Sequence, residues 1–210
     1  MREILVSSDA NVARAADALR CGALVAFPTE TVYGLGGNAH ADESVLKIFR
    51  RKGRPQSKPL SVCYADFAKA LDDVEIEDRA LILAEKFLPG PLTIVLKRRS
   101  SSKLSSLCSA GLETIGVRVP YNRTALDLLS RLPFPLAAPS ANRSGESSPR
   151  TAQEVFNSLE NNENLIILDG GPCSIGVEST IVDLTNNQIT RIGAISPEQI
   201  KREICLDGIK

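Results

Sequence analysis

The chain has 210 residues, of which 43% are hydrophobic and 4% aromatic, and its 25 basic and 25 acidic residues give a formal net charge of zero. This length fits one large α/β domain or two small ones, and the alternation of elements along the chain favours a single domain over residues 1–210. Zero net charge neither favours nor excludes a nucleic-acid partner. No apolar signal core and no membrane-length apolar run occur in the sequence, which predicts a cytoplasmic location without membrane contact.

Helical and strand patterns alternate along the chain. In chain order we predict a helix over 11–20 capped by Asp9 or Asn11, a strand over 23–27, a helix over 42–51, a strand over 59–64, a helix over 78–87, strands over 92–96 and 114–119, a helix over 124–129, a strand over 136–138, a helix over 151–159, strands over 165–168, 180–184 and 189–192, and a final helix that starts at Ser196. This order predicts an α/β (α+β) fold in which helices pack on a mixed sheet.

Cysteine and histidine usage limits the chemistry. The five cysteines are scattered and odd in number and form no Cys-x-x-Cys pair, so we expect reduced thiols rather than a disulfide framework or a zinc site. The only histidine, His40, lies in a polar stretch, and we expect it in a surface loop. A catalytic triad and a protein-held metal are therefore not predicted.

The segment 27–37 follows a predicted strand and is rich in glycine. Glycine permits unusual backbone angles and the close approach of a ligand, and Thr29 and Thr31 add small hydroxyl groups. It matches neither a dinucleotide fingerprint nor a phosphate-binding Walker loop. From glycine content alone, a ligand loop and an ordinary turn remain equally open.

A second segment, 50–59, carries five cations within nine positions. Gly53 and Pro55 end the preceding helix, so we expect Lys52 and Arg54 on a solvent-facing loop. Arginine binds phosphate through a bidentate fork and lysine binds it as a point charge. The segment therefore predicts a phosphate site, with a solvated basic turn as the alternative.

Arg118 interrupts an apolar strand, where an unpaired cation is costly. Its partner is either an internal acid or a ligand carboxylate or phosphate. If the partner is a ligand, we expect the guanidinium to be mostly solvated in the empty site. Two further polar segments, 137–149 and 176–180, follow strands and offer hydroxyl and amide groups to a ligand. The residues alone thus predict a pocket for an anionic, phosphorylated molecule.

Together these segments resemble the YrdC-like family of threonylcarbamoyl-adenylate synthases. The resemblance rests on Pro28–Gly36, Lys52–Pro55 with Lys58–Leu60, Pro89–Thr93, Gly116–Pro120, Pro139–Gly145 and Glu178–Thr180, and it runs from about Ala23 to Gly193. It implies an open, mixed, twisted sheet with helices packed on it around a concave basic cavity, here as one short YrdC-like domain.

The resemblance also implies roles for individual residues. It places Lys52 and Arg54 in catalysis, Arg54, Lys58, Thr114, Ser140, Ser148 and Arg191 around ATP, and Thr31, Cys63, Arg118, Ala138 and Ser179 around L-threonine. Asn142 lies between the two sets. Many relatives carry histidine where this chain has Cys63, so the contact at that position departs from the family pattern. Mg²⁺ is expected with ATP, and no metal ligand is assigned in the protein.

Members of this family form threonylcarbamoyl-AMP from L-threonine, bicarbonate or CO₂, and ATP, and they release pyrophosphate. A downstream threonylcarbamoyltransferase machinery then modifies tRNA. The resemblance therefore implies a nucleotidyltransferase. Two alternatives stay open, a non-catalytic RNA-binding maturation factor and a carbamoyltransferase-type domain. Weak RNA binding is an open partner prediction for this chain.

Overall fold

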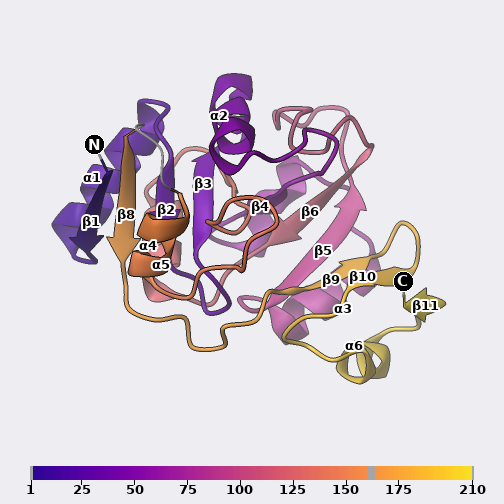
Figure 1. Ribbon diagram of the computed structural model, residues 1–210. Coiled ribbons are helices and arrows are strands. Elements are labelled where there is room, and N and C mark those ends of the chain that lie inside the picture. The colour runs from indigo at the N-terminus through magenta and orange to yellow at the C-terminus, as the bar shows by residue number, and fades with distance from the viewer. Residues whose placement is uncertain (1, 160–163, 210) are drawn as a thin grey trace.

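The computed structural model describes residues 2–159 and 164–209, in which eleven strands form one mixed sheet with the order β1-β8-β2-β3-β7-β4-β6-β5-β9-β10-β11 (Figure 1). The strands are β1 (Arg2–Val6), β2 (Val25–Phe27), β3 (Gly34–Asn38), β4 (Ser61–Cys63), β5 (Leu92–Lys97), β6 (Thr114–Arg118), β7 (Leu136–Ala137), β8 (Leu165–Asp169), β9 (Thr180–Asp183), β10 (Gln188–Arg191) and β11 (Gly208–Ile209). The helices are α1 (Asp9–Arg20), α2 (Asp42–Lys52), α3 (Asp78–Phe87), α4 (Arg123–Ser130), α5 (Ala152–Ser158) and α6 (Pro197–Glu203), with a 3₁₀ turn, η1 (Phe67–Asp72).

Strand pairing confirms the mixed sheet predicted from the alternation of elements. Parallel pairs join β1 to β8, β8 to β2, β4 to β6, β5 to β9 and β10 to β11. Antiparallel pairs join β2 to β3, β3 to β7, β7 to β4, β6 to β5 and β9 to β10. The central strands β4, β6 and β7 bring together segments that are far apart in the sequence, and this is where the predicted site residues converge.

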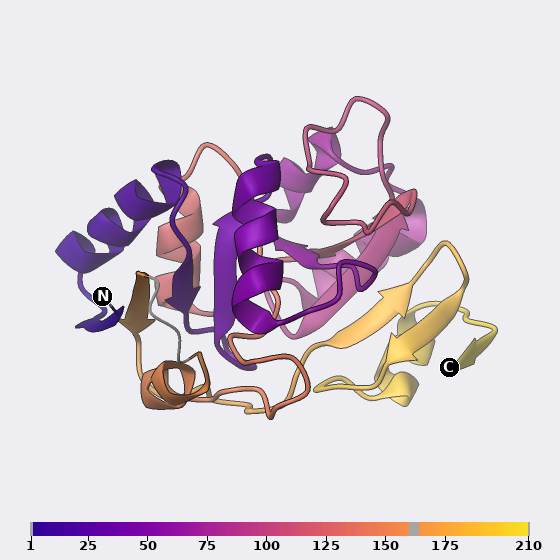
Figure 2. The ribbon, with the colours of Figure 1, turned by 45° about the horizontal axis from the view of Figure 1, so that its top comes forward.

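Helices cover both faces of the sheet. Val25 and Phe27 pack in a cluster with α1 and α4, whereas Ala26 between them packs in a second cluster that includes α2, α3, α5 and α6. Successive side chains of a strand point to opposite faces, so these two clusters lie on opposite sides of β2. Figure 2 shows α2 lying against β3. In the ranges that the structure describes, every helix is too short or too polar to cross a membrane.

Most predicted elements are present, with shifted ends. The helix over 78–87 is found as predicted. The last helix begins at Pro197, and the predicted first residue, Ser196, is its N-cap in a capping box with Gln199. The first helix begins earlier than predicted and is capped by Ser8, whose side chain accepts from the Asn11 amide, so the predicted caps were wrong.

The segment 34–38 is strand β3, although its composition predicted a loop. Its glycines fit because the sheet packs tightly there. A Cβ on Gly36 would lie 2.8 Å from the Phe27 ring, and one on Gly37 would lie 2.9 Å from a Leu24 methyl group. β1 and β11 were also missed, and both lie at the edges of the sheet.

Candidate functional site

A cavity opens at the centre of the sheet, where β4, β5, β6, β7 and β9 meet. It is lined by Val32, Arg54, Pro59, Leu60, Ser61, Thr93, Arg118, Ala138, Pro139, Ser140, Glu178, Ser179, Ile181 and Arg191. Three of these residues are arginines and one is a glutamate. The enclosed volume is about 160 Å³. That suits a small polar molecule and leaves a larger ligand partly outside, since pockets for drug-sized ligands start at about 300 Å³.

Arg118, the last residue of β6, forms a buried ion pair. Its side chain reaches Glu30 over 2.8 Å from Nη2 to Oε1, and the same nitrogen donates to Thr31 Oγ1 at 2.7 Å. The residue is only 8% exposed, and its Nε is buried without a partner among the described residues. The internal acid predicted as one possible partner is therefore present, and the expectation of a mostly solvated guanidinium was wrong.

The hydroxyl groups beside this pair have a defined direction. Thr29 Oγ1 donates to the Val32 carbonyl at 2.6 Å and lies 2.9 Å from Thr31 Oγ1. A hydroxyl group has one proton, so Thr31 donates to Thr29 and accepts from Arg118. Thr31 itself is fully buried. It therefore braces Arg118 from behind and does not line the cavity.

A second network surrounds Arg191 at the end of β10. Its Nη1 lies 3.0 Å from Glu178 Oε2, Nη2 donates to Ser179 Oγ at 3.0 Å, and Nε donates to the Ser179 carbonyl at 2.9 Å. Glu178 also accepts from Ser148 Oγ at 2.7 Å. Burial lowers the pKa of the Arg191 guanidinium, and the Glu178 carboxylate opposes that shift. Glu178 thus joins two predicted ATP contacts, Ser148 and Arg191.

Lys52 has a different position from the one predicted. It is the last residue of α2, which ends because Gly53 adopts the left-handed conformation at φ 57°. Its side chain is 2% exposed, and Nζ donates to the Ser140 carbonyl and, at 2.5 Å, to the Asn142 carbonyl. Burial lowers the pKa of Lys52 to about 7, and the nearby Arg54 adds to this effect.

The expectation of a solvent-facing Lys52 is therefore wrong, because the ammonium group points into the protein. Its backbone carbonyl also accepts from the Ser144 amide at 2.7 Å. Asn142 is held in the same loop, where Nδ2 donates to the carbonyls of Arg143 and Glu146 at 2.9 and 2.8 Å. Lys52 and Asn142 shape the loop that carries Ser140 to the cavity.

Arg54 does lie on the loop after α2, half-buried at the cavity wall. Its Nη2 donates to the Pro59 carbonyl at 2.9 Å and its Nε to the Lys58 carbonyl at 3.3 Å. Burial lowers the pKa of Arg54, and Arg191 lowers it further. Arg54 and Arg191 both line the cavity, and two cations at one cavity wall are expected of a site for a polyanion.

The remaining predicted residues fall into two groups. Ala138, Ser140 and Ser179 line the cavity with Arg54, Arg118 and Arg191. Lys58 is exposed and outside the lining set, and Thr114 lies at the far end of β6, where it pairs with Lys97. Cys63 pairs with Arg118 across β4 and β6, but its thiol packs in the α1 and α4 cluster, and burial raises its pKa to about 11.

Sequence reasoning missed Glu30 and Glu178. Both lie inside motifs that were singled out, but an acid gives no signal of its own in a segment expected to bind anions. Thr93 was also missed as a site residue, although its hydroxyl contacts that of Ser179 at 2.8 Å.

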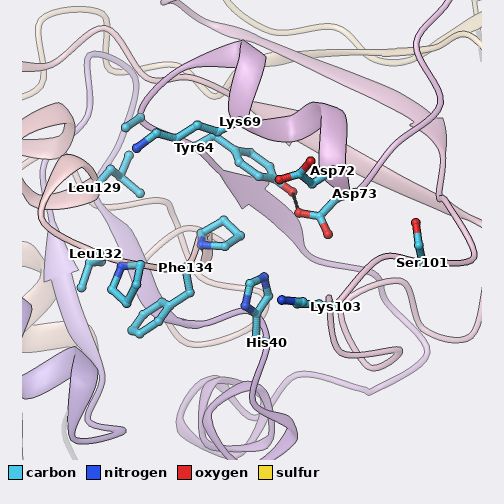
Figure 3. A pocket seen from close by; sticks show the side chains of 13 residues that line it. His40, Tyr64, Lys69, Asp72, Asp73, Ser101, Lys103, Leu129, Leu132 and Phe134 are labelled. Carbon is cyan, nitrogen blue, oxygen red and sulfur yellow. Dashed lines mark hydrogen bonds between the residues drawn. The ribbon is translucent and has the colours of Figure 1, made fainter.

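A larger second cavity, of about 550 Å³, lies at the opposite ends of β3, β4 and β7 (Figure 3). His40 points into it beside Lys103, and Tyr64 Oη donates to Asp73 at 2.9 Å. His40 is in a turn as expected but is partly buried, and this burial lowers its pKa. Among the described residues no group of three or more His, Cys, Asp or Glu side chains could hold a metal ion.

Known proteins resemble this chain in sequence over most of its length. The domain model Sua5/YciO/YrdC, described as "Telomere recombination", matches residues 17–193. The threonylcarbamoyl-AMP synthases of Bacillus subtilis (strain 168) and Pyrococcus abyssi (strain GE5 / Orsay) are 43% and 44% identical to the chain over 204 and 193 residues. These matches cover 95% and 90% of the chain but 58% and 56% of the relatives, so the chain spans less than two thirds of their length.

Solved structures agree with the fold. Sua5 of P. abyssi, complexed with L-threonine, has a TM-score of 0.92 at 40% identity, with coverage of 100% of this chain and 62% of that one. YciO of E. coli has a TM-score of 0.82 at 23% identity, with coverage of 95% of this chain and 100% of that one. The likeness to YciO shows the fold alone.

Proposed function

The chain belongs to the Sua5/YciO/YrdC family, and on that basis we propose that it is an enzyme that forms threonylcarbamoyl-AMP from L-threonine, bicarbonate or CO₂, and ATP. It would act as a nucleotidyltransferase, because an adenylyl group moves from ATP to a carbamate. The continuous sheet supports one YrdC-like domain over residues 1–210.

One observation carries the proposal: Arg118 is held rigidly at the wall of a small polar cavity. The bound L-threonine of the P. abyssi relative supports an amino acid as the ligand of this cavity. Arg118 would bind the threonine carboxylate through a charge-assisted hydrogen bond from Nη1, because Glu30 and Thr31 already occupy Nη2. Ala138 and Ser179, on the facing walls, would contact the rest of the molecule.

The ATP end of the site would lie toward Arg54 and Arg191. Their shared space suits a triphosphate, and Ser140 and Ser148 would add hydroxyl contacts. Mg²⁺ would enter as part of the MgATP substrate. The donor set fits this, because Glu178 is the one carboxylate among the lining residues and it is already engaged by Arg191 and Ser148. Mg²⁺ takes few protein ligands when phosphates and water supply the others.

The reaction needs positioning more than covalent help. The threonine amine attacks the carbon of CO₂ and loses a proton, and the resulting carbamate oxygen attacks the α-phosphorus of ATP as pyrophosphate leaves. Both steps gather negative charge in one place. Fixed arginines stabilise that charge without reorganising during the reaction, which is the largest effect that such a site supplies.

The test measures pyrophosphate release with each substrate omitted in turn. We expect release only when ATP, Mg²⁺, L-threonine and bicarbonate are all present. Equal ATP turnover without threonine would rule out the synthase. Binding of RNA with steep salt dependence and no pyrophosphate release would identify the RNA-binding alternative instead. Release with carbamoyl phosphate in place of threonine and bicarbonate would identify a carbamoyltransferase-type domain. A cytoplasmic location and delivery of the product to tRNA-modifying machinery remain part of the proposal.

A further inference from the structure

Glu30 ties together three segments around the proposed threonine site. Its Oε1 accepts from Arg118 Nη2 at 2.8 Å, its Oε2 accepts from the Tyr121 amide at 3.0 Å, and its carbonyl accepts from the Ile175 amide at 2.8 Å. The Glu30 side chain is 3% exposed, so it does not line the cavity. We infer that Glu30 is a positioning residue that fixes Arg118 for binding the substrate carboxylate, an inference that rests on the proposed function.

The donor pattern of Arg118 supports this role. All its hydrogen bonds to described residues leave from Nη2, one to Glu30 and one to Thr31. That nitrogen has two protons, so both are used. Nη1 is left for a ligand, and the guanidinium cannot rotate about its stem without breaking both contacts. The contacts to Glu30 and Thr31 therefore fix which edge of the Arg118 guanidinium faces the cavity.

Thr31 holds Arg118 in one orientation together with Glu30, because the hydroxyl proton of Thr31 is donated to Thr29. A hydroxyl group that could rotate would tolerate a shifted guanidinium, whereas this one presents a lone pair in one direction. Glu30 supplies charge and Thr31 supplies direction. An amino-acid carboxylate then meets an arginine whose orientation is set before binding, which reduces the entropy lost on association.

A competing effect predicts the opposite result. The Glu30 carboxylate partly neutralises Arg118, so its removal would strengthen the field that attracts the substrate carboxylate. If Glu30 only competes, Glu30→Gln binds threonine more tightly. If Glu30 positions Arg118, Glu30→Gln binds threonine more weakly, because glutamine keeps only one acceptor oxygen and its NH₂ group must face either Arg118 or the Tyr121 amide, which are both donors.

The experiment measures dissociation constants of Glu30→Gln for L-threonine, for L-threoninamide, which lacks the carboxylate, and for ATP alone. We expect threonine binding to weaken tenfold or more, with threoninamide and ATP binding changed less than twofold. The matched control is Glu75→Gln, which breaks an exposed 3.3 Å ion pair to Lys97 and should change none of the three.

Loss of threonine and threoninamide binding to the same extent would make Glu30 a general scaffold residue and overturn the inference, as would unchanged or tighter threonine binding. If Glu30→Gln does not fold, Thr31→Val tests the same brace, with the same selective loss for threonine expected and an equal loss for both ligands refuting it. If wild-type protein binds ATP but not threonine, the proposed function fails and this inference fails with it. If wild type binds threonine but the variant shows no selective loss of threonine binding, the inference about Glu30 is refuted and the proposed function is unaffected.

Discussion

Replacing Lys52 by methionine tests whether a buried ammonium group holds the loop at the cavity. Lys52 Nζ donates to the carbonyls of Ser140 and Asn142, and the residue is 2% exposed. Methionine keeps a flexible apolar stem of similar length and removes both the charge and the donors. The variant therefore isolates the ionisable group from the packing of the side chain.

The magnitude follows from the pKa. Burial lowers the pKa of Lys52 from 10.5 to about 7 in the folded protein. One pKa unit corresponds to about 1.4 kcal/mol, so keeping the group charged in the fold costs about 5 kcal/mol. Below pH 7 both states carry the proton and the folded state bears this whole cost. Between pH 7 and 10.5 the unfolded chain holds more protons than the folded one, so the free energy of unfolding rises with pH.

Integrated from pH 6 to pH 9, the Lys52 contribution to stability rises by about 2–3 kcal/mol. For a chain of this size that corresponds to roughly 5–10 °C in Tm. At pH 9 the neutral amine still has two protons for the two backbone carbonyls of Ser140 and Asn142, so the loop remains attached. We thus expect the stability of wild type relative to Lys52→Met to increase across this range.

The assay is urea unfolding of wild type and Lys52→Met at pH 6, 7.5 and 9, with Lys47→Met as the control. Lys47 lies on the same helix but its side chain is 38% exposed and pairs with Glu43 at 3.2 Å. The free energy of unfolding of Lys47→Met relative to wild type should not change with pH. If the stability of wild type relative to Lys52→Met stays constant with pH, the Lys52 ammonium is solvated. If that relative stability falls as pH rises, internal acids stabilise the charge.

Two further predictions concern the cavity wall. Arg54→Ala should leave Tm near wild type but slow pyrophosphate release roughly thirtyfold to a thousandfold, because a charge-assisted contact to the transition state is worth about 2–4 kcal/mol. The control Arg50→Ala, at an exposed position of α2, should change neither Tm nor the rate of pyrophosphate release. Wild-type turnover of Arg54→Ala would make this loop merely a basic surface. Gly193→Ala should weaken threonine binding, because the added Cβ would overlap backbone atoms next to Ser179, while Gly111→Ala, whose Cβ meets nothing within 4 Å, should affect stability alone. Equal threonine affinity in both glycine variants would contradict that argument.

Local sequence patterns predicted the elements that are defined by local interactions. The helix over 78–87 has an apolar stripe of its own and was found within its predicted bounds. Strand β1 was missed because it depends on parallel pairing with β8, where Arg2 meets Leu165 across most of the chain length. Strand β3 was missed because glycine is rare in strands, and only tertiary packing, such as the Phe27 ring against Gly36 and Leu24 against Gly37, explains why glycine is needed there.

In the site, too, the sequence showed local features but not the contacts that only the fold creates. The sequence pattern identified Arg54 and Arg118, because cations in loops or apolar strands are conspicuous, and the family resemblance added Arg191. It could not identify their partners, since Glu30 and Arg118 are 88 positions apart and only the fold brings them within 2.8 Å. It also placed Lys52 on the surface, because Gly53 marks the end of a helix but does not show which way the last side chain turns.

These partners explain how a cation-rich cavity can exist before its anionic ligands arrive. Arg118 is paired with Glu30, and Arg191 is paired with Glu178, so two of the three lining arginines have an internal acid. The pairs differ in burial, since the Glu30 side chain is 3% exposed and that of Glu178 is 37% exposed. A buried pair is difficult to break, because separation leaves an uncompensated charge. A half-exposed pair costs less to open. Arg118 should therefore keep Glu30 when threonine binds, whereas Arg191 can exchange Glu178 for phosphate. Under the proposed function, the amino-acid end of the cavity would be rigid and the nucleotide end adjustable, which suits a small ligand held in a fixed place and a larger one that must enter and leave.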